Sequence, residues 1–282
     1  MTDDTPEFIQ KSVDELVDIA RGCRREIVKM VKRANAGHPG GSLSVIDIIV
    51  GLYGRTLRAS PAEPKHPGRD RLILSKGHAS PAMYAALHAF DFLDESDLHS
   101  YRMYNGICQG HVDSKWTPGI DFSGGSLGMG LSFGLGIAIS GRLSGRDHHS
   151  WVILGDGECQ EGEIWEAAMA AVHHRLENVT VIVDVNGIQN DDFVDQQMVM
   201  GDLSAKWTAF GWKVRDMNGH NMTEISEAIE WSKTTVGPCA ILARTTKGKG
   251  VSFMEGVDKW HHRRFKGNEF QDAFDELTLD DK

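Results

Sequence analysis

The chain has 282 residues, of which 40% are hydrophobic and 25% are charged, and its formal net charge is −10. These values are typical of a globular protein, and they argue against binding to nucleic acid or anionic membranes, because both functions need clustered Lys and Arg. The one basic cluster, residues 259–266, is interpreted as an anion site or a solvated face.

The sequence carries no signal for export or membrane insertion. Its first ten residues are acidic and lack the apolar region of a secretory signal, and no stretch of about 18 apolar residues indicates a membrane span. The four cysteines are too far apart to indicate a metal site or a disulfide framework. We therefore expect a cytoplasmic protein whose partners include neither nucleic acid nor a membrane.

Apolar residues at helical spacing predict a first helix over residues 7–34, which ends at the Gly- and Pro-containing stretch 35–40. Ser44 is expected to cap a second helix that runs through Leu57. The later elements are predicted in this order: strand 71–74, helix 81–90, helix 94–103, helix 127–143, strand 151–154, helix 162–174, strand 179–183, helix 203–210, strand 212–216, a helix to Lys233 that opens with a capping box of Asn221 and Glu224, and strand 239–244.

Strands and helices alternate along most of the chain. This order predicts an α/β fold: a doubly wound, mostly parallel sheet with helices on both faces. We see no internal repeat or linker and expect a single domain over residues 1–282, with a C-terminal tail from about residue 262. The stretch 105–125 is expected to be a long loop, and such loops in compact domains are often functional.

Asp156 and Asn186 come directly after two of the predicted strands, in the segments LGDGE and DVNGI. A carboxylate and a carboxamide at the ends of neighbouring strands are oxygen ligands suited to a small divalent cation that also holds phosphate oxygens. The adjacent glycines let the backbone approach a phosphate, and a helix N-terminus supplies free N–H groups. Asp-Gly and Asn-Gly are also common in ordinary turns, but the helix and strand between the two sites have the length of a crossover unit.

Histidines lie in four Gly-containing loops between predicted elements: His38, His78, His111 and His261. Ligands of open α/β sheets bind at the loops beyond the strand carboxyl ends. A neutral histidine there can move a proton near pH 7 or donate a hydrogen bond to a hydroxyl or phosphate. Any one of these histidines alone is more often an ordinary surface residue, so the interpretation depends on their occurring together.

Several motifs together make the chain resemble the N-terminal part of transketolase, the thiamine-diphosphate enzyme that moves two-carbon ketol units. The resemblance covers residues 16–261, nearly the whole chain. It rests on six motifs in order: AGHPGGSLSVIDI, RLILSKGHASPAMYAAL, GHVDSKWTPGIDFSGGSLGMGLSFGLGIAI, LGDGECQEGEIWEAA, DVNGIQND and TTKGKGVSFMEG. The implied fold is the diphosphate-binding domain of thiamine-diphosphate enzymes.

The resemblance implies a metal and cofactor site at the strand ends. Asp156, the side chain of Asn186 and the backbone carbonyl of Ile188 would bind Mg²⁺, or Ca²⁺ or Mn²⁺ in its place. Gly155 and Gly157 would contact the diphosphate of the cofactor through the backbone.

The remaining cofactor contacts are implied for His78 and His261, near the diphosphate and thiazolium, and for Gly125 and Leu127, which would line the aminopyrimidine and thiazolium pocket. The sequence departs from the family nearby, because Ser126 replaces a common Pro and Met129 a common Gln.

Catalytic roles are implied for four residues: His38, His111 and His261 would face the substrate, and Glu161 would lie at the subunit interface, in the acidic network that links paired active sites. His262 stands where the family usually has Gly. Either His261 or His262 could therefore fill the family position.

A full transketolase is more than twice as long as this chain and has three domains. The missing pyrimidine-binding domain would supply a carboxylate to the cofactor, and most residues that bind the sugar phosphate should lie there. We therefore expect one subunit of a split transketolase that works with a separate C-terminal subunit, in an α2β2 assembly. The alternatives are half of a 1-deoxyxylulose-5-phosphate synthase-like or 2-oxo acid dehydrogenase-type enzyme, and a non-catalytic cofactor-binding module.

Overall fold

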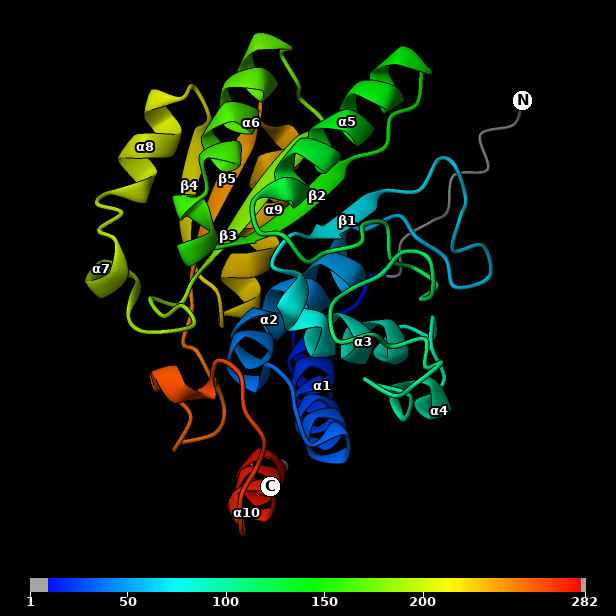
Figure 1. The fold of residues 1–282 in the computed structure, drawn as a ribbon. Helices are drawn as coiled ribbons and strands as arrows, with labels where there is room; N and C mark the ends of the chain where they lie inside the picture. Colours follow the sequence, from blue (N-terminus) through cyan, green and yellow to red (C-terminus); the bar gives the residue numbers. More distant parts are fainter. Residues whose placement is uncertain (1–9, 280–282) are drawn as a thin grey trace.

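The computed structural model describes residues 10–279 of the chain. Its centre is one five-stranded sheet in the order β1-β2-β3-β5-β4, in which every neighbouring pair is parallel (Figure 1). The strands are β1 (Arg71–Leu74), β2 (Ser150–Gly155), β3 (Val179–Val185), β4 (Lys213–Asn218) and β5 (Cys239–Arg244). The predicted parallel α/β fold is confirmed.

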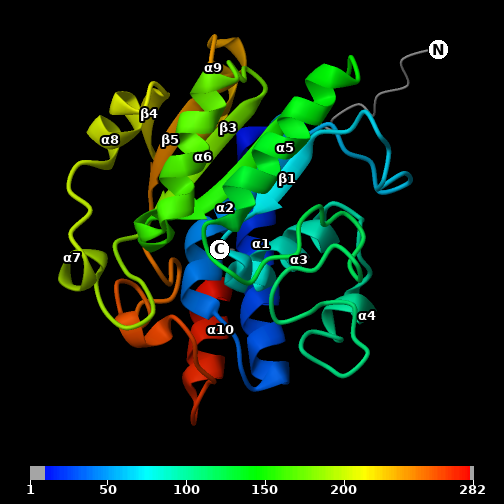
Figure 2. The same cartoon turned by 45° about the horizontal axis from the view of Figure 1, so that its top comes forward.

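Helices cover both faces of the sheet, because side chains of the buried central strands alternate between two apolar cores. In β2, Trp151 and Ile153 belong to one core and Val152 and Leu154 to the other. On the second face, in front of the sheet in Figures 1 and 2, lie α5 (Met129–Leu143), α6 (Gly162–His173) and α8 (Leu203–Ala209).

The first face is covered by two layers of helices. Nearer the sheet are α2 (Pro39–Arg55), α3 (Ser80–Ala89) and α9 (Met222–Thr234). Outside them, α1 (Val13–Ala34) packs on α2 and α3, and α10 (Glu269–Leu279) packs on α1. The remaining elements are short: α4 (Glu95–Leu98), α7 (Val194–Gln197) and the 3-10 helices η1 (Gly77–Ala79), η2 (Gly157–Gln160) and η3 (Asp258–Trp260).

The start of the first helix differs from the prediction. Residues 7–9 lie outside the described part of the chain, and α1 begins at Val13. Ser12 and Glu15 form a reciprocal capping box there, with each side chain accepting from the other residue's backbone N–H. This box satisfies two backbone donors at the start of the helix.

The predicted cap of the second helix is wrong, because α2 begins at Pro39, well before Ser44. Proline suits the first turn of a helix, since its fixed φ is already helical and it has no N–H to satisfy. The following glycine allows a close approach: a Cβ on Gly40 would lie 2.7 Å from the carbonyl oxygen of Trp260. Ser44 instead donates its hydroxyl to Asp184 Oδ2 at 2.6 Å, inside the protein.

Two other helix boundaries and one predicted capping box also differ from the prediction. The helix expected over residues 94–103 is the single turn α4, and α5 starts after Gly128, whose φ of +83° breaks the helical path. Asn221 does cap α9, but the box with Glu224 is not closed, because that carboxylate accepts from the backbone of Asn218 instead.

The segment expected as a tail from about residue 262 folds onto the body of the protein. Ala273 and Leu277 of α10 are buried in the first core together with Phe265. No helix among the described residues is long and apolar enough to cross a membrane, and all four cysteines are buried and free.

Candidate functional site

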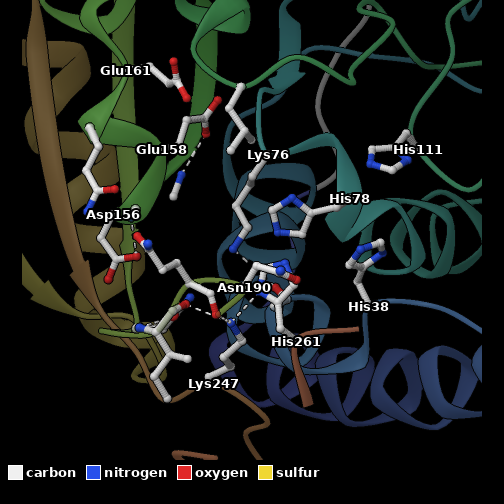
Figure 3. A pocket seen from close by; sticks show the side chains of 18 of the residues that line it. His38, Lys76, His78, His111, Asp156, Glu158, Glu161, Asn190, Lys247 and His261 are labelled. Atoms are coloured by element: carbon white, nitrogen blue, oxygen red, sulfur yellow. Dashed lines mark hydrogen bonds between the residues drawn. The ribbon is translucent and has the colours of Figure 1, made fainter. Parts of the chain in front are cut away.

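A cavity of about 390 Å³ lies where β1, β2, β3 and β5 end (Figure 3). This is the edge at which parallel α/β sheets bind their ligands. All twelve residues predicted from the sequence line it: His38, His78, His111, Gly125, Leu127, Gly155, Asp156, Gly157, Glu161, Asn186, Ile188 and His261. They come from several separate stretches of chain, so the fold brings together what the sequence keeps apart.

Asp156 and Asn186 are held in place by backbone N–H groups. The Asp156 carboxylate accepts from Gly157 N at 2.8 Å and from Gly187 N at 2.6 Å, and the Asn186 amide oxygen accepts from Ile188 N at 3.1 Å. Each oxygen keeps a lone pair for another partner. The two side chains are therefore oriented before anything binds.

Lys247, in the loop after β5, connects the two sides of the cavity. Its ammonium group donates to the carbonyl oxygens of Ile188 at 2.8 Å and Gln189 at 3.3 Å, and lies 2.7 Å from His261 Nδ1. When Lys247 is protonated it can only donate to this nitrogen, and the proton of a neutral His261 ring then lies on Nε2. Burial, followed by the nearby charge of Lys76, lowers the pKa of Lys247 to about 7.

Lys76, after β1, forms an ion pair with Asp184 of β3 underneath the cavity. Both side chains are almost fully buried, at 2% and 0% exposure. The Asp184 carboxylate also accepts from Ser44 and Thr245 and from the Asn186 amide. Burial acts against ionisation of Asp184, but Lys76 together with the hydrogen bonds from Ser44 and Thr245 outweighs it, so the net pKa is lowered and this carboxylate stays charged.

Glu158, in η2, joins three loops that form the wall of the cavity. One carboxylate oxygen accepts from Ser75 Oγ and from Gly128 N at 2.9 Å, and the other accepts from Gly155 N at 3.0 Å. Ser75 Oγ in turn accepts from Gly130 N at 3.2 Å. Because the side chain is 3% exposed, these bonds are shielded from water.

Five histidines form a row from the inside of the cavity to its mouth. The ring centroids of His78 and His261 are 4.9 Å apart, those of His261 and His38 5.5 Å, and those of His38 and His262 4.5 Å. The ring of His111 lies 5.7 Å from that of His38. The structure thus places both His261 and His262 beside His38.

The histidines are neutral at pH 7. Burial is the main cause in each case: it lowers the pKa of His38 to about 2 and that of His261 to about 3, and neighbouring histidines and the cations Lys76, Lys247 and Arg102 add to it. The pKa values of His78, His111 and His262 are lowered in the same way. Each ring therefore offers one N–H donor and one nitrogen acceptor to a ligand.

The pKa of Asp156 is raised, whereas that of Lys247 is lowered. Burial raises the pKa of its carboxyl to about 6, although the backbone N–H groups of Gly187 and Gly157 oppose the rise. A bound cation would keep Asp156 ionised, and a bound anion would keep Lys247 protonated. The cavity is therefore suited to a ligand that carries both, such as a metal-complexed diphosphate.

The donor set fits such a ligand but not a metal ion alone. Among the described residues, no three His, Cys, Asp or Glu side chains are grouped to hold a metal. Asp156, Asn186 and Ile188 supply one carboxylate, one amide and one carbonyl, so a hard cation would need further oxygens from the ligand. The backbone at Gly125 is open, since a Cβ there would meet nothing within 4 Å, whereas at Gly157 a Cβ would lie only 2.8 Å from Gln189 Oε1, so a larger residue would crowd the cavity wall.

Four charged side chains of this site were not predicted from the sequence: Lys76, Glu158, Asp184 and Lys247. Lys76 and Lys247 lie in the SKGH and TKGK motifs, where a lysine beside glycines after a strand could have indicated a diphosphate site. Nothing in the local pattern around Glu158 or Asp184 indicates their buried contacts.

Several known proteins resemble this chain over most of its length. The family model described as transketolase, thiamine diphosphate binding domain, matches residues 17–282. The chain is 38% identical to one subunit of the apulose-4-phosphate transketolase of Phocaeicola vulgatus (90% of this chain, 91% of that protein). It is also 38% identical to one subunit of the 6-deoxy-6-sulfo-D-fructose transketolase of a Clostridium species (90% and 93%).

Longer relatives match only in part. Human transketolase is 32% identical over 95% of this chain and 43% of its own length. The crystal structure of Campylobacter jejuni transketolase superimposes with a TM-score of 0.89 at 32% identity, again over 95% of this chain and 43% of that one. This chain thus spans less than half of those transketolases but nearly all of the two relatives named as subunits. The predicted identity is confirmed: the chain belongs to the transketolase family and corresponds to its thiamine diphosphate binding domain.

Proposed function

We propose that this chain is the cofactor-binding subunit of a two-chain transketolase, which transfers a two-carbon ketol unit from a ketose to an aldose. The observation that supports this most directly is the single cavity in which Asp156, Asn186, Lys247 and the histidine row converge. The relatives of matching length are themselves named as transketolase subunits.

The cofactor would be held at the strand ends. Asp156, Asn186 and the carbonyl of Ile188 would bind Mg²⁺, or Ca²⁺ or Mn²⁺, together with diphosphate oxygens, and Gly155 and Gly157 would allow the diphosphate to approach the backbone. Lys247 and Lys76 add positive charge beneath the same point. Gly125 and Leu127 would line the pocket for the rings of the cofactor.

Bound thiamine diphosphate supplies the electron sink that allows a carbon–carbon bond next to a carbonyl to break and form. The chain contributes hydrogen bonds and proton transfer. His261 presents its Nε2–H to the cavity because Nδ1 accepts from Lys247, and His38 has a buried Nδ1 without a partner among the described residues. Being neutral, His38, His111 and His261 can bind sugar hydroxyls and accept or return a proton.

A second subunit would complete the site. Apolar side chains around the start of α5 are exposed, Leu127 by 36%, Met129 by 46% and Phe133 by 42%, and a Cβ on Gly128 in the same stretch would lie 2.9 Å from Glu161 Cβ. Burying such side chains stabilises an assembly by about 25 cal/mol per Å² of apolar surface. This exposed apolar surface would bind the separate subunit that carries the pyrimidine-binding domain. The assembly would be an α2β2 tetramer with Glu161 at the interface.

The substrate class is a sugar with an anionic group. Of the two relatives described above as subunits, one is named for a sugar phosphate and one for a sulfonated sugar. We therefore propose a ketose phosphate, or a related sulfonated sugar, as the donor and an aldose as the acceptor.

The direct test is a ketol-transfer assay with thiamine diphosphate and Mg²⁺, run on this chain by itself, on the candidate C-terminal partner by itself and on the mixture. Activity in the mixture only is expected, because the cofactor needs residues of both chains. Robust transfer by this chain by itself would contradict the two-chain proposal, and cofactor binding without transfer in the mixture would contradict the enzymatic one.

A further inference from the structure

A second hollow of about 580 Å³ opens beside the cofactor cavity, at the mouth of the histidine row. The two spaces share His38, His111 and Asn190. The other walls of the outer hollow are formed by Arg102, Gln109, Gly110, Val112, Asp113, Ser123, Gly124 and His262. The outer hollow therefore adjoins the cofactor cavity along the histidine row.

Arg102 is held in an unusual conformation at this hollow. Its φ is +58°, in the left-handed region that non-glycine residues seldom adopt, and its N–H donates to the carbonyl of Cys108 at 2.9 Å. The guanidinium lies against Gly110, where an added Cβ would be 3.1 Å from Nη1. The fold thus positions this side chain although the side chain itself is exposed.

No acidic side chain neutralises Arg102 among the described residues. Several buried or half-buried arginines elsewhere are paired with a carboxylate, such as Arg24 with Asp47 and Arg58 with Asp70. Asp113 is the acidic residue that lines the outer hollow, and its Oδ1 already accepts from Lys115 N at 2.9 Å and Ser123 Oγ at 3.0 Å. The positive charge of Arg102 helps to lower the pKa values of His38, His111 and His262, after burial.

His262 adds a second donor beside this cation. Its ring lies 4.5 Å from that of His38, and its backbone is fixed by the next residue, whose N–H donates to the carbonyl of Gly37 at 3.1 Å. The ring is exposed to the outer hollow. Glycine, the usual family residue at this position, could not make such a contact.

We propose that Arg102 and His262 bind the terminal anionic group of the sugar, a phosphate or a sulfonate, and so give this chain a direct part in substrate selection. This inference rests on the proposed function and refines it, because the family resemblance implied that the phosphate would be bound largely by the partner subunit. A guanidinium offers two parallel N–H donors that match a tetrahedral oxyanion, and a neutral imidazole adds a third. With the ketol end of the sugar near His78 and His261, the row of rings directs its other end toward Arg102.

The test compares three donors in the assembled two-chain enzyme: a ketose phosphate, the corresponding sulfonated ketose and the ketose without an anionic group. In Arg102→Gln, we expect the ratio of kcat/KM for the phosphorylated over the neutral donor to fall on the order of tenfold to a hundredfold, through KM, because a charge-assisted hydrogen bond is lost. His262→Gly should lower the same ratio less. The comparison between phosphate and sulfonate shows which oxyanion the site prefers.

Arg175→Gln is the matched control, since Arg175 is an exposed arginine with a φ of +51° that lines neither hollow. Equal losses of kcat with all three donors in Arg102→Gln would overturn the proposal, since they would show that Arg102 only positions the histidines. An unchanged ratio would overturn it as well.

A second measurement does not need catalysis. Inorganic phosphate is titrated into the chain while the His262 ring is followed by NMR in the wild type, Arg102→Gln and Arg175→Gln. We expect a saturable shift that Arg102→Gln loses and Arg175→Gln keeps; a wild type without a shift, or a shift that Arg102→Gln retains, would overturn the proposal. If the shift is present but the assembled enzyme transfers no ketol unit with any donor, the proposed function fails while the anion site stands.

Discussion

Two regions of the cofactor cavity differ in burial. In the floor, which we define as Lys76, Asp184 and Glu158, the side chains are almost fully buried and bind one another or the ends of neighbouring loops. At the mouth, Arg102 and His262 are exposed and have no acidic partner among the described residues. The floor joins the ends of β1, β2 and β3 through charged hydrogen bonds. The mouth consists of loop residues around an open hollow.

This difference indicates which part of the ligand each region serves. A cofactor is the same in every turnover, so a preorganised floor avoids the cost of ordering side chains when it binds. Sugars enter and leave, and groups without internal partners are available for them. Variants of each region test whether floor and mouth are separable in this way.

The largest effect is expected from Glu158→Ala. The change leaves Ser75 Oγ and the N–H groups of Gly128 and Gly155 without an acceptor inside the protein. We expect the free energy of unfolding to fall by about 3–5 kcal/mol in urea denaturation. Glu158→Gln, which keeps one acceptor oxygen, should lose less, and exposed Glu177→Ala should change stability by no more than about 0.5 kcal/mol. If Glu158→Ala and Glu177→Ala are equally stable, the floor is not held by this carboxylate.

Asp156→Ala tests the metal-dependent part of the floor. The affinity for thiamine diphosphate in Mg²⁺, measured by calorimetry, should fall about 100-fold or more, because the charged ligand of the cation is removed. Asp195→Ala, at an exposed position in α7, should bind the cofactor like the wild type. Unchanged affinity in Asp156→Ala would refute the metal role.

His38, at the transition from floor to mouth, should make stability depend on pH. Burial first, then the nearby histidines and Arg102, lower its pKa from 6.5 to about 2. Below about pH 6.5, His38 therefore binds a proton in the unfolded chain but not in the folded protein. Its contribution leaves the free energy of unfolding unchanged above about pH 6.5 and lowers it by about 1.4 kcal/mol for each pH unit below that. His38→Gln should remove that part of the slope between about pH 6 and pH 4.5, while exposed His99→Gln should not. An unchanged slope in His38→Gln would mean that His38 is protonated in the folded state.

The smallest effect is expected where the mouth is anchored to α10. Arg263 Nη2 donates to both carboxylate oxygens of Glu269, at 2.9 and 3.0 Å, and its guanidinium lies 4.0 Å from the Trp260 ring centroid. Because the pair is partly exposed, Glu269→Gln should lower the free energy of unfolding by less than about 1 kcal/mol. A loss as large as that of Glu158→Ala would show that the mouth is as rigidly coupled as the floor.

Local sequence patterns were sufficient for the sheet, for Asp156 and Asn186 and for the four loop histidines, whereas the cavity positions of Gly125, Leu127, Glu161 and Ile188 were predicted only through the resemblance to transketolase. Asp156, Asn186 and the four predicted histidines follow strands or occupy Gly-containing loops, and these patterns are visible within a few neighbouring residues. Each end of each predicted strand lies within about two residues of the corresponding end in the structure. The cap at Ser44 was wrong because its hydroxyl is used by Asp184, a residue far away in the sequence.

The buried pairs of the site could not be predicted in this way. Lys76 follows β1 and Asp184 belongs to β3, and β2 lies between those strands in the sheet. Their contact depends on the strand order and on how far a lysine reaches, neither of which is encoded near either residue. Arg102 is similar, since its place beside His262 depends on two loops that are distant in the chain.

The position of α10 on α1 has a consequence for synthesis of the protein. The segment with His261 and His262 lies between β5 and α10, and Phe265, Ala273 and Leu277 fix it to the first core. A chain leaves the ribosome from its N-terminus at about 5–20 residues per second, so the sheet with Asp156 and Asn186 is exposed before α10 exists. His38, His78 and His111 also precede α10 in the chain, so His261 and His262 are the part of the cavity that is completed last, when α10 has emerged and docked on α1.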